Sequence, residues 1–86
     1  MEITCFLWTA HAELRLTQRG LGRIEVEEIV RERPEARESN FGHADWRVYG
    51  RRLDGGWCAV ICDHPIDKDE DTVRIVSVWT LKGDRL

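Results

Sequence analysis

Three basic side chains recur at four-residue intervals early in the chain: His11, Arg15 and Arg19. In a helix, residues four apart are neighbours about 6 Å from one another on one face. Like charges at this spacing repel mildly, so the row suits an anionic partner that carries phosphates or carboxylates. The same residues also have a purely structural interpretation. In that case Arg19 interacts with the last carbonyls of the helix, Arg15 pairs with an acid and His11 hydrogen-bonds in the core.

A second set of basic side chains falls on segments expected to be strands. Arg47, Tyr49 and Arg51 alternate along one such segment and therefore share one face of the strand. If the helices cover one side of the sheet, these groups line the other side, where they can hold a phosphodiester. The alternative is that they are ordinary exposed strand residues. The last strand is expected to carry three further residues on one face: Arg74, Thr80 and Lys82.

Cys58, Cys62 and His64 are residue types that bind metals, but their spacing is unsuitable. In a strand, Cys58 and Cys62 share a face and lie about 13 Å apart, at about 3.3 Å per residue. Two Zn–S bonds of about 2.3 Å do not span that distance. A nucleophile pair of Cys62 and His64 is about 7 Å apart, which is too far for proton transfer. The spacing predicts buried, reduced cysteines, and we expect no metal and no cofactor.

The elements that position these groups are indicated by periodicity and by end signals. Thr9 is a suitable N-cap and Gly20 a suitable C-terminal stop, which predicts a helix over Ala10–Arg19. Two later segments, 57–63 and 72–81, are apolar on both sides, which predicts strands in the interior of a sheet. The full expected order is a strand at 2–8, helices at 10–19 and 23–33, a loop or weak edge strand at 35–45, and strands at 46–53, 57–63 and 72–81. This order predicts an α+β fold with an N-terminal strand, two helices and then a three- to four-stranded antiparallel sheet.

Length and composition indicate one small domain over residues 1–86. The net charge is −3, with residues 1–52 neutral and the excess of acids in residues 53–86. Dedicated nucleic-acid-binding domains are usually strongly basic, which this chain is not. Three cysteines, an odd number, without a signal peptide predict a reducing, cytoplasmic compartment. No run approaches the ~18 apolar residues of a membrane span, so we expect no membrane partner.

The string HAELRLTQRGL, from His11 to Leu21, resembles the signature of a bacterial family of small proteins of unknown function. In that family a His-Ala-x-x-Arg-x-x-x-Arg-Gly-(Ile/Leu) helix opens the domain. The segments VEEIVRERP and VRIVSVWT are also similar to the family's second helix and last strand, so the resemblance spans about Cys5 to Lys82. The family is remotely similar to the RelE-like toxins of toxin–antitoxin systems. The BrnT-type toxins are close in layout, and their Tyr/Ile-Gly-Arg strand is similar to residues 49–51 here.

The resemblance implies a RelE-like fold, in which two helices pack on one side of an antiparallel sheet and RNA binds the opposite face or the sheet edge. It also implies an antitoxin-like protein partner, and a homodimer is a further candidate assembly. RelE-like toxins are usually strongly basic, so the acidic composition departs from their pattern.

The leading hypothesis is an RNA-binding protein of the toxin–antitoxin type, with metal-independent endoribonuclease activity as its catalytic form. Cleavage needs a group that deprotonates the 2′-hydroxyl, cations at the phosphate and a proton donor for the leaving oxygen. The alternative is a non-catalytic protein-binding module on the same scaffold, and a third hypothesis makes the helix motif purely architectural. The predicted catalytic residues are His11, Tyr49 and Arg51. The predicted substrate-binding residues are Arg15, Arg19, Arg47, Arg74 and Lys82.

Overall fold

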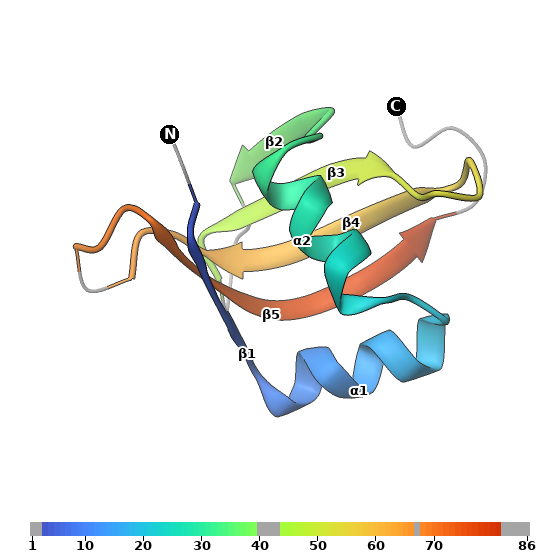
Figure 1. Cartoon of the computed structure of the whole chain (residues 1–86), viewed down its shortest axis with the longest axis horizontal. Helices are drawn as coiled ribbons and strands as arrows, with labels where there is room; N and C mark the ends of the chain where they lie inside the picture. Colours follow the sequence, from blue (N-terminus) through green and yellow to red (C-terminus); the bar gives the residue numbers. More distant parts are fainter. Residues whose placement is uncertain (1–2, 40–43, 67, 82–86) are drawn as a thin grey trace.

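A computed structural model describes residues 3–39, 44–66 and 68–81. The predicted α+β class, with one strand and two helices ahead of the remaining strands, is confirmed (Figure 1). The helix at 10–19 and the strands at 57–63 and 72–81 have the bounds that the sequence predicts, and the weak edge strand is present. The elements in chain order are β1 (Cys5–Trp8), α1 (Ala10–Arg19), α2 (Arg23–Arg31), β2 (Ala36–Ser39), β3 (Trp46–Arg51), β4 (Trp57–Asp63) and β5 (Thr72–Leu81).

The ends of α1 are determined by its capping residues. The Thr9 hydroxyl accepts a hydrogen bond from the backbone N–H of Ala12, which satisfies one of the unpaired donors of the first turn. Gly20 adopts a left-handed conformation with φ of 66°, and its N–H donates to carbonyls of the last turn. Glycine takes this conformation without steric cost, so the predicted start and stop of the helix are both confirmed.

The sheet has five strands in the order β1-β5-β4-β3-β2. It is mixed, because β1 runs parallel to β5 while the other neighbours are antiparallel. The sequence predicts a three- to four-stranded antiparallel sheet after the helices and no pairing for the N-terminal strand. That pairing joins residues 67 apart in the chain, such as Cys5 and Thr72, and local periodicity carries no signal for it. The predicted interior position of β4 and β5 is confirmed, since each has a strand on both sides.

A β-bulge interrupts the pairing of β4 with β5. Ile61 lies opposite Ser77 and Cys62 lies opposite Ile75, so Val76 is an extra residue in β5. A bulge of this kind reverses the side-chain alternation of the strand that contains it. Residues after Val76 therefore point to the face opposite to the one that simple alternation predicts.

Helix α2 packs on one face of the sheet, named here the α2 face. A Cβ atom on Gly50 would lie 3.1 Å from Cγ1 of Ile29 and even closer to its Cγ2, so only glycine allows α2 to approach β3 this closely. Val26, Val60 and Val78 are fully buried in the core at this face. The other face, named the second face, carries Tyr49 and its alternating neighbours on β3.

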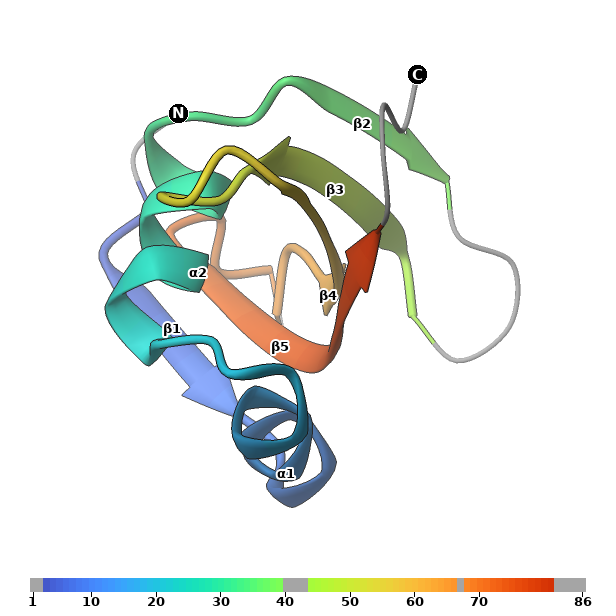
Figure 2. The same ribbon diagram turned by 90° about the vertical axis from the view of Figure 1, so that its right-hand side faces the viewer.

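Helix α1 lies at the edge of the sheet, alongside β5 and apart from α2 (Figure 2). Ala12 and Leu16 are the buried residues of α1, and both belong to the core. Only one narrow side of α1 therefore packs against the core. The neighbouring positions on the helix point toward the second face of the sheet. Neither described helix is long and apolar enough to cross a membrane.

Candidate nucleic-acid interface

Two arginines of α1 share one tryptophan ring. The Cζ atoms of Arg15 and Arg19 lie 4.6 Å and 4.9 Å from the centroid of the Trp79 ring. Trp79 is 38% exposed, so a ligand can reach this cluster. Neither arginine has a carboxylate within ion-pair distance in the part of the chain that the structure describes. Two of the three basic residues predicted to share a helix face, Arg15 and Arg19, thus contact one aromatic ring, that of Trp79.

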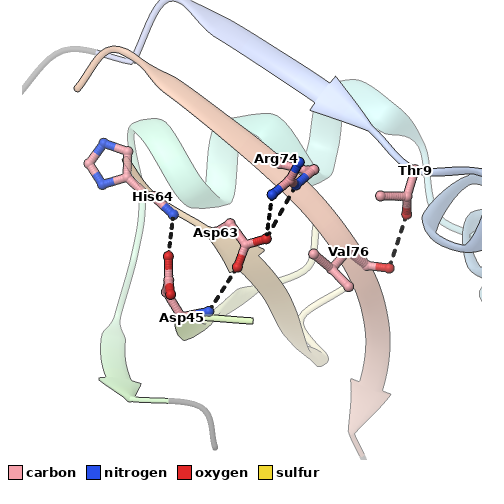
Figure 3. A network of polar contacts seen from close by, with 6 residues as sticks. All are labelled: Thr9, Asp45, Asp63, His64, Arg74 and Val76. Carbon is pink, nitrogen blue, oxygen red and sulfur yellow. Dashed lines mark hydrogen bonds and ion pairs between the residues drawn. The ribbon is translucent and has the colours of Figure 1, made fainter. Parts of the chain in front are cut away.

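The start of α1 is attached directly to β5. The Thr9 hydroxyl donates to the carbonyl of Val76 at 3.2 Å (Figure 3), and the Thr9 N–H donates to the carbonyl of Ile75 at 3.2 Å. These bonds fix the helix against the bulged part of the strand. Arg15 and Arg19 are about one helical turn apart, so both can reach the same ring farther along β5.

The bulge decides where the Trp79 side chain points. Trp79 lies opposite Ala59, and Ala59 lies opposite Tyr49, so all three are on the second face. With unbroken alternation, Trp79 would share the α2 face with Val73 and Ile75. Trp79 was not among the site residues predicted from the sequence. Because residues 72–81 are apolar on both sides, the sequence carries no signal for the bulge that turns Trp79.

The same bulge overturns one prediction for the last strand. Arg74 lies opposite Asp63 on the second face, whereas Thr80 lies opposite Cys58 and belongs to the α2 face. These two residues were expected to share a face, and the extra residue in β5 separates them. Lys82, predicted to complete that row, lies outside the described residues.

His11 is exposed and lies next to the arginine pair. Nε of Arg15 donates to Nε2 of His11 at 3.4 Å, and Nη1 of Arg15 donates to the Gln18 side chain at 2.9 Å. The structural interpretation of the motif placed His11 in the core and Arg15 in an ion pair, and the described chain shows neither. The Nε2 lone pair of His11 faces Arg15, so this hydrogen bond must break before that nitrogen can take a proton from a substrate.

Tyr49 and Arg47 lie on the same face, in a cluster with an acid. The Tyr49 hydroxyl donates to Oε1 of Glu38 at 2.8 Å, and Nη1 of Arg47 is 3.4 Å from that hydroxyl and 3.8 Å from Oε1 of Glu38. The hydrogen bond to Tyr49 raises the pKa of Arg47 above its usual range. Tyr49 is two strands from Trp79, about 10 Å across the sheet. The first helix and this strand therefore contribute to one face, although Tyr49 itself is buried.

Arg51 forms a second arginine–tryptophan pair. Its Cζ lies 4.5 Å from the centroid of the Trp57 ring, and its Nη1 donates to the carbonyl of Gly55 at 2.9 Å. Arg51 is exposed and has no ion pair with a described residue. Its positive charge is thus available to a ligand on the second face.

Arg74 is the predicted binding residue whose charge is most fully matched inside the protein. Its Nε and Nη2 donate to Oδ2 of Asp63 at 3.2 Å and 3.1 Å (Figure 3). The other oxygen of Asp63 accepts from the N–H of Asp45, and the Asp45 carboxylate accepts from the N–H of His64. This network ties the ends of β4 and β5 to the segment before β3.

Several donors on the second face have no acceptor. Nε of Arg19, Nε1 of Trp57 and Oγ of Ser77 are buried without a hydrogen-bond partner among the described residues. Leaving such a group unsatisfied costs about 1–3 kcal/mol. Because these atoms have almost no exposed surface, an external acceptor reaches them only if the surrounding side chains move.

Cys58 and Cys62 are free, buried and on the α2 face, as the spacing predicts. Burial raises the pKa of each thiol to about 12, so neither is a thiolate nucleophile near neutral pH. Among residues 3–39, 44–66 and 68–81 there is no group of three or more His, Cys, Asp or Glu side chains placed to hold a metal ion.

Comparisons with protein-family models, with curated proteins and with solved structures find no match for this chain. A function for the domain is therefore inferred from its own geometry.

Proposed function

We propose that this domain binds single-stranded RNA on the second face of its sheet, with Arg15, Arg19 and Trp79 at the centre of the interface. The observation that carries the proposal is the pair of guanidinium groups on one partly exposed indole ring. Guanidinium groups bind phosphates bidentately and also stack on bases. Cationic and aromatic groups side by side are the usual components of sites for single-stranded nucleic acid.

The local charge of this face supports an anionic ligand. Arg15, Arg19 and Arg51 have no ion pair with a described residue, whereas Arg47 and Arg74 are matched by acids. Screening at physiological salt has a length of about 8 Å, so distant acids weaken this patch little. The net charge of −3 therefore does not prevent phosphate binding at the second face.

Cleavage of the bound strand is a second activity, favoured by the position of His11 beside Arg15. In this reaction His11 takes the proton of a 2′-hydroxyl, and the 2′-oxygen forms a bond to phosphorus. The bond from phosphorus to the 5′-oxygen breaks, which leaves a 2′,3′-cyclic phosphate, and the 5′-oxygen takes a proton from water to become a hydroxyl. Arg15 stabilises the crowded phosphate, and Arg51 and Tyr49 act as positioning groups in this scheme.

The resemblance to RelE-like and BrnT-type toxins supports a place in a toxin–antitoxin pair. An acidic antitoxin segment would then compete with RNA for the same arginines. The alternative function is a non-catalytic module that binds an acidic protein segment through the same unpaired arginines.

The test measures binding of a fluorescent RNA of about twelve nucleotides, a length within single-stranded site sizes. Trp79→Ala and the double variant Arg15→Gln/Arg19→Gln should each weaken binding about tenfold or more, since stacking contributes about 1–3 kcal/mol per base. Arg23→Gln is the matched control, because Arg23 also lies on a tryptophan ring, 5.2 Å from Trp8, but has Glu13 as ion-pair partner. RNA binding that is absent, or equal in all variants, refutes the proposal.

Two further arms separate the candidate activities. A poly-glutamate peptide that binds through the same arginines while RNA does not would favour the protein-binding alternative. Incubation of RNA with wild type and with His11→Ala tests cleavage through the appearance of 2′,3′-cyclic ends. Intact RNA with wild-type protein would exclude the endoribonuclease activity and leave the binding proposal in place.

A further inference from the structure

A pocket of about 310 Å³ opens on the α2 face, on the other side of the sheet from Trp79 and Trp57. It forms because the helix is shorter than the strands that it covers. The nine residues of α2 span about 14 Å. The ten residues of β5 span about 33 Å. The last residues of α2, Val30 and Arg31, form one wall of the pocket together with Pro34.

The interior of the pocket is apolar. Ile3, Val48, Val73 and Cys62 are buried residues that line it, and the Trp46 ring adds a flat wall. The Trp46 ring is held in place because its Nε1 donates to the carbonyl of His64 at 3.1 Å. Ligand pockets commonly have volumes of about 300–1,000 Å³ and this type of lining. The volume and lining therefore suit a small molecule.

Charged side chains also line the pocket: Arg31, Arg37 and one acid, Glu35. Arg31 already has an ion-pair partner, Glu32, at 3.4 Å. The Arg37 guanidinium lies 4.2 Å from the centroid of the Trp46 ring and has no ion pair with a described residue.

We infer that this pocket binds a small monocarboxylate with an apolar body. The body lies against Val48, Val73 and the Trp46 ring, and the carboxylate pairs with Arg37 at the rim. Among the described arginines, only four have no ion pair: Arg15, Arg19, Arg51 and Arg37. Three of these serve the second face, which leaves Arg37 as the cation available to this pocket. The inference is independent of RNA binding, because it uses other residues on the other side of the sheet.

The experiment titrates the full chain with 2-naphthoate and with its neutral isostere 2-naphthamide. Binding is measured by calorimetry and by the indole N–H signals in a ¹H–¹⁵N correlation spectrum. We expect naphthoate to shift the Trp46 signal, to leave the Trp79 signal in place, and to bind about tenfold or more tightly than naphthamide, the scale of one hydrogen bond to a charged group. A parallel titration with octanoate shows whether the apolar body must be flat.

Charge variants then test the role of Arg37. Arg37→Gln should weaken naphthoate binding about tenfold, to the level of naphthamide. Glu35→Gln, which removes the one acidic side chain of the lining, should instead tighten it, and Arg23→Gln should leave it unchanged. The opposite signs keep the test decisive even if one variant folds poorly. Absence of a Trp46 shift, equal affinity for naphthoate and naphthamide, or unchanged affinity of Arg37→Gln would overturn the inference.

Discussion

The salt dependence of RNA binding offers the sharpest test of the arginine–tryptophan face. A protein that neutralises Z phosphates of a single strand shows a slope of about −0.7Z in a plot of log affinity against log salt concentration. Arg15, Arg19 and Arg51 are the arginines of this face without an ion pair in the described chain, so Z is three. The perturbation is the double variant Arg15→Gln/Arg19→Gln, which leaves Arg51 alone.

The expected numbers follow from these charges. The wild type should show a slope of about −2.1, so that a fourfold rise in salt, from about 50 to about 200 mM, lowers affinity roughly 18-fold. The double variant should show a slope of about −0.7 and lose only roughly 2.6-fold over the same range. Arg47 and Arg74 contribute little to either slope, because Glu38 and Asp63 already neutralise them.

The assay is fluorescence anisotropy of a labelled single-stranded RNA at several salt concentrations. Arg23→Gln, whose arginine is paired with Glu13, should keep the wild-type slope. A wild-type slope shallower than about −1 would show that these arginines do not contact phosphates. An unchanged slope in the double variant would refute the assignment to Arg15 and Arg19.

Three further predictions concern the core and the cysteines. Gly50→Ala should destabilise the fold by about 1–3 kcal/mol, because the new Cβ overlaps Ile29. Ile29→Ala should lower the free energy of unfolding less in the Gly50→Ala background than in the wild type. Urea unfolding of the two single variants and the double variant measures this difference, and additive changes in that free energy would contradict the contact. At about pH 8, iodoacetamide should modify Cys5 in the native protein but neither Cys58 nor Cys62. Mass spectrometry counts the modified cysteines, and modification of all three would contradict the burial of Cys58 and Cys62. Burial raises the pKa of the Cys58 and Cys62 thiols to about 12, so these thiols ionise at lower pH in the unfolded chain than in the folded protein. The free energy of unfolding should therefore fall as pH rises from about 9 toward 12, by up to about 1.4 kcal/mol per pH unit for each thiol. Urea melts at increasing pH test this slope, which should be halved in Cys62→Ala.

Several features of the fold were predictable because their signals are local. Thr9 and Gly20 bound α1 through backbone hydrogen bonds within one turn, and these are chemical properties of those two residues. The apolar character of β4 and β5 on both sides likewise reflects their interior positions. The four-residue spacing of Arg15 and Arg19 correctly placed both guanidinium groups on one side of a helix.

What the sequence determined by itself, then, is the class of the fold, the order of the elements, the ends of α1, β4 and β5, and the common direction of the α1 arginines, because each depends on contacts between near neighbours in the chain. Only the tertiary structure decided that β1 pairs with β5, that the extra residue Val76 turns Trp79 toward those arginines, and that the end of α2 leaves a pocket beside Arg37. These features depend on how segments distant in the chain meet. A single bulge reverses which face every later side chain of its strand occupies, and residue alternation alone does not show where that bulge lies.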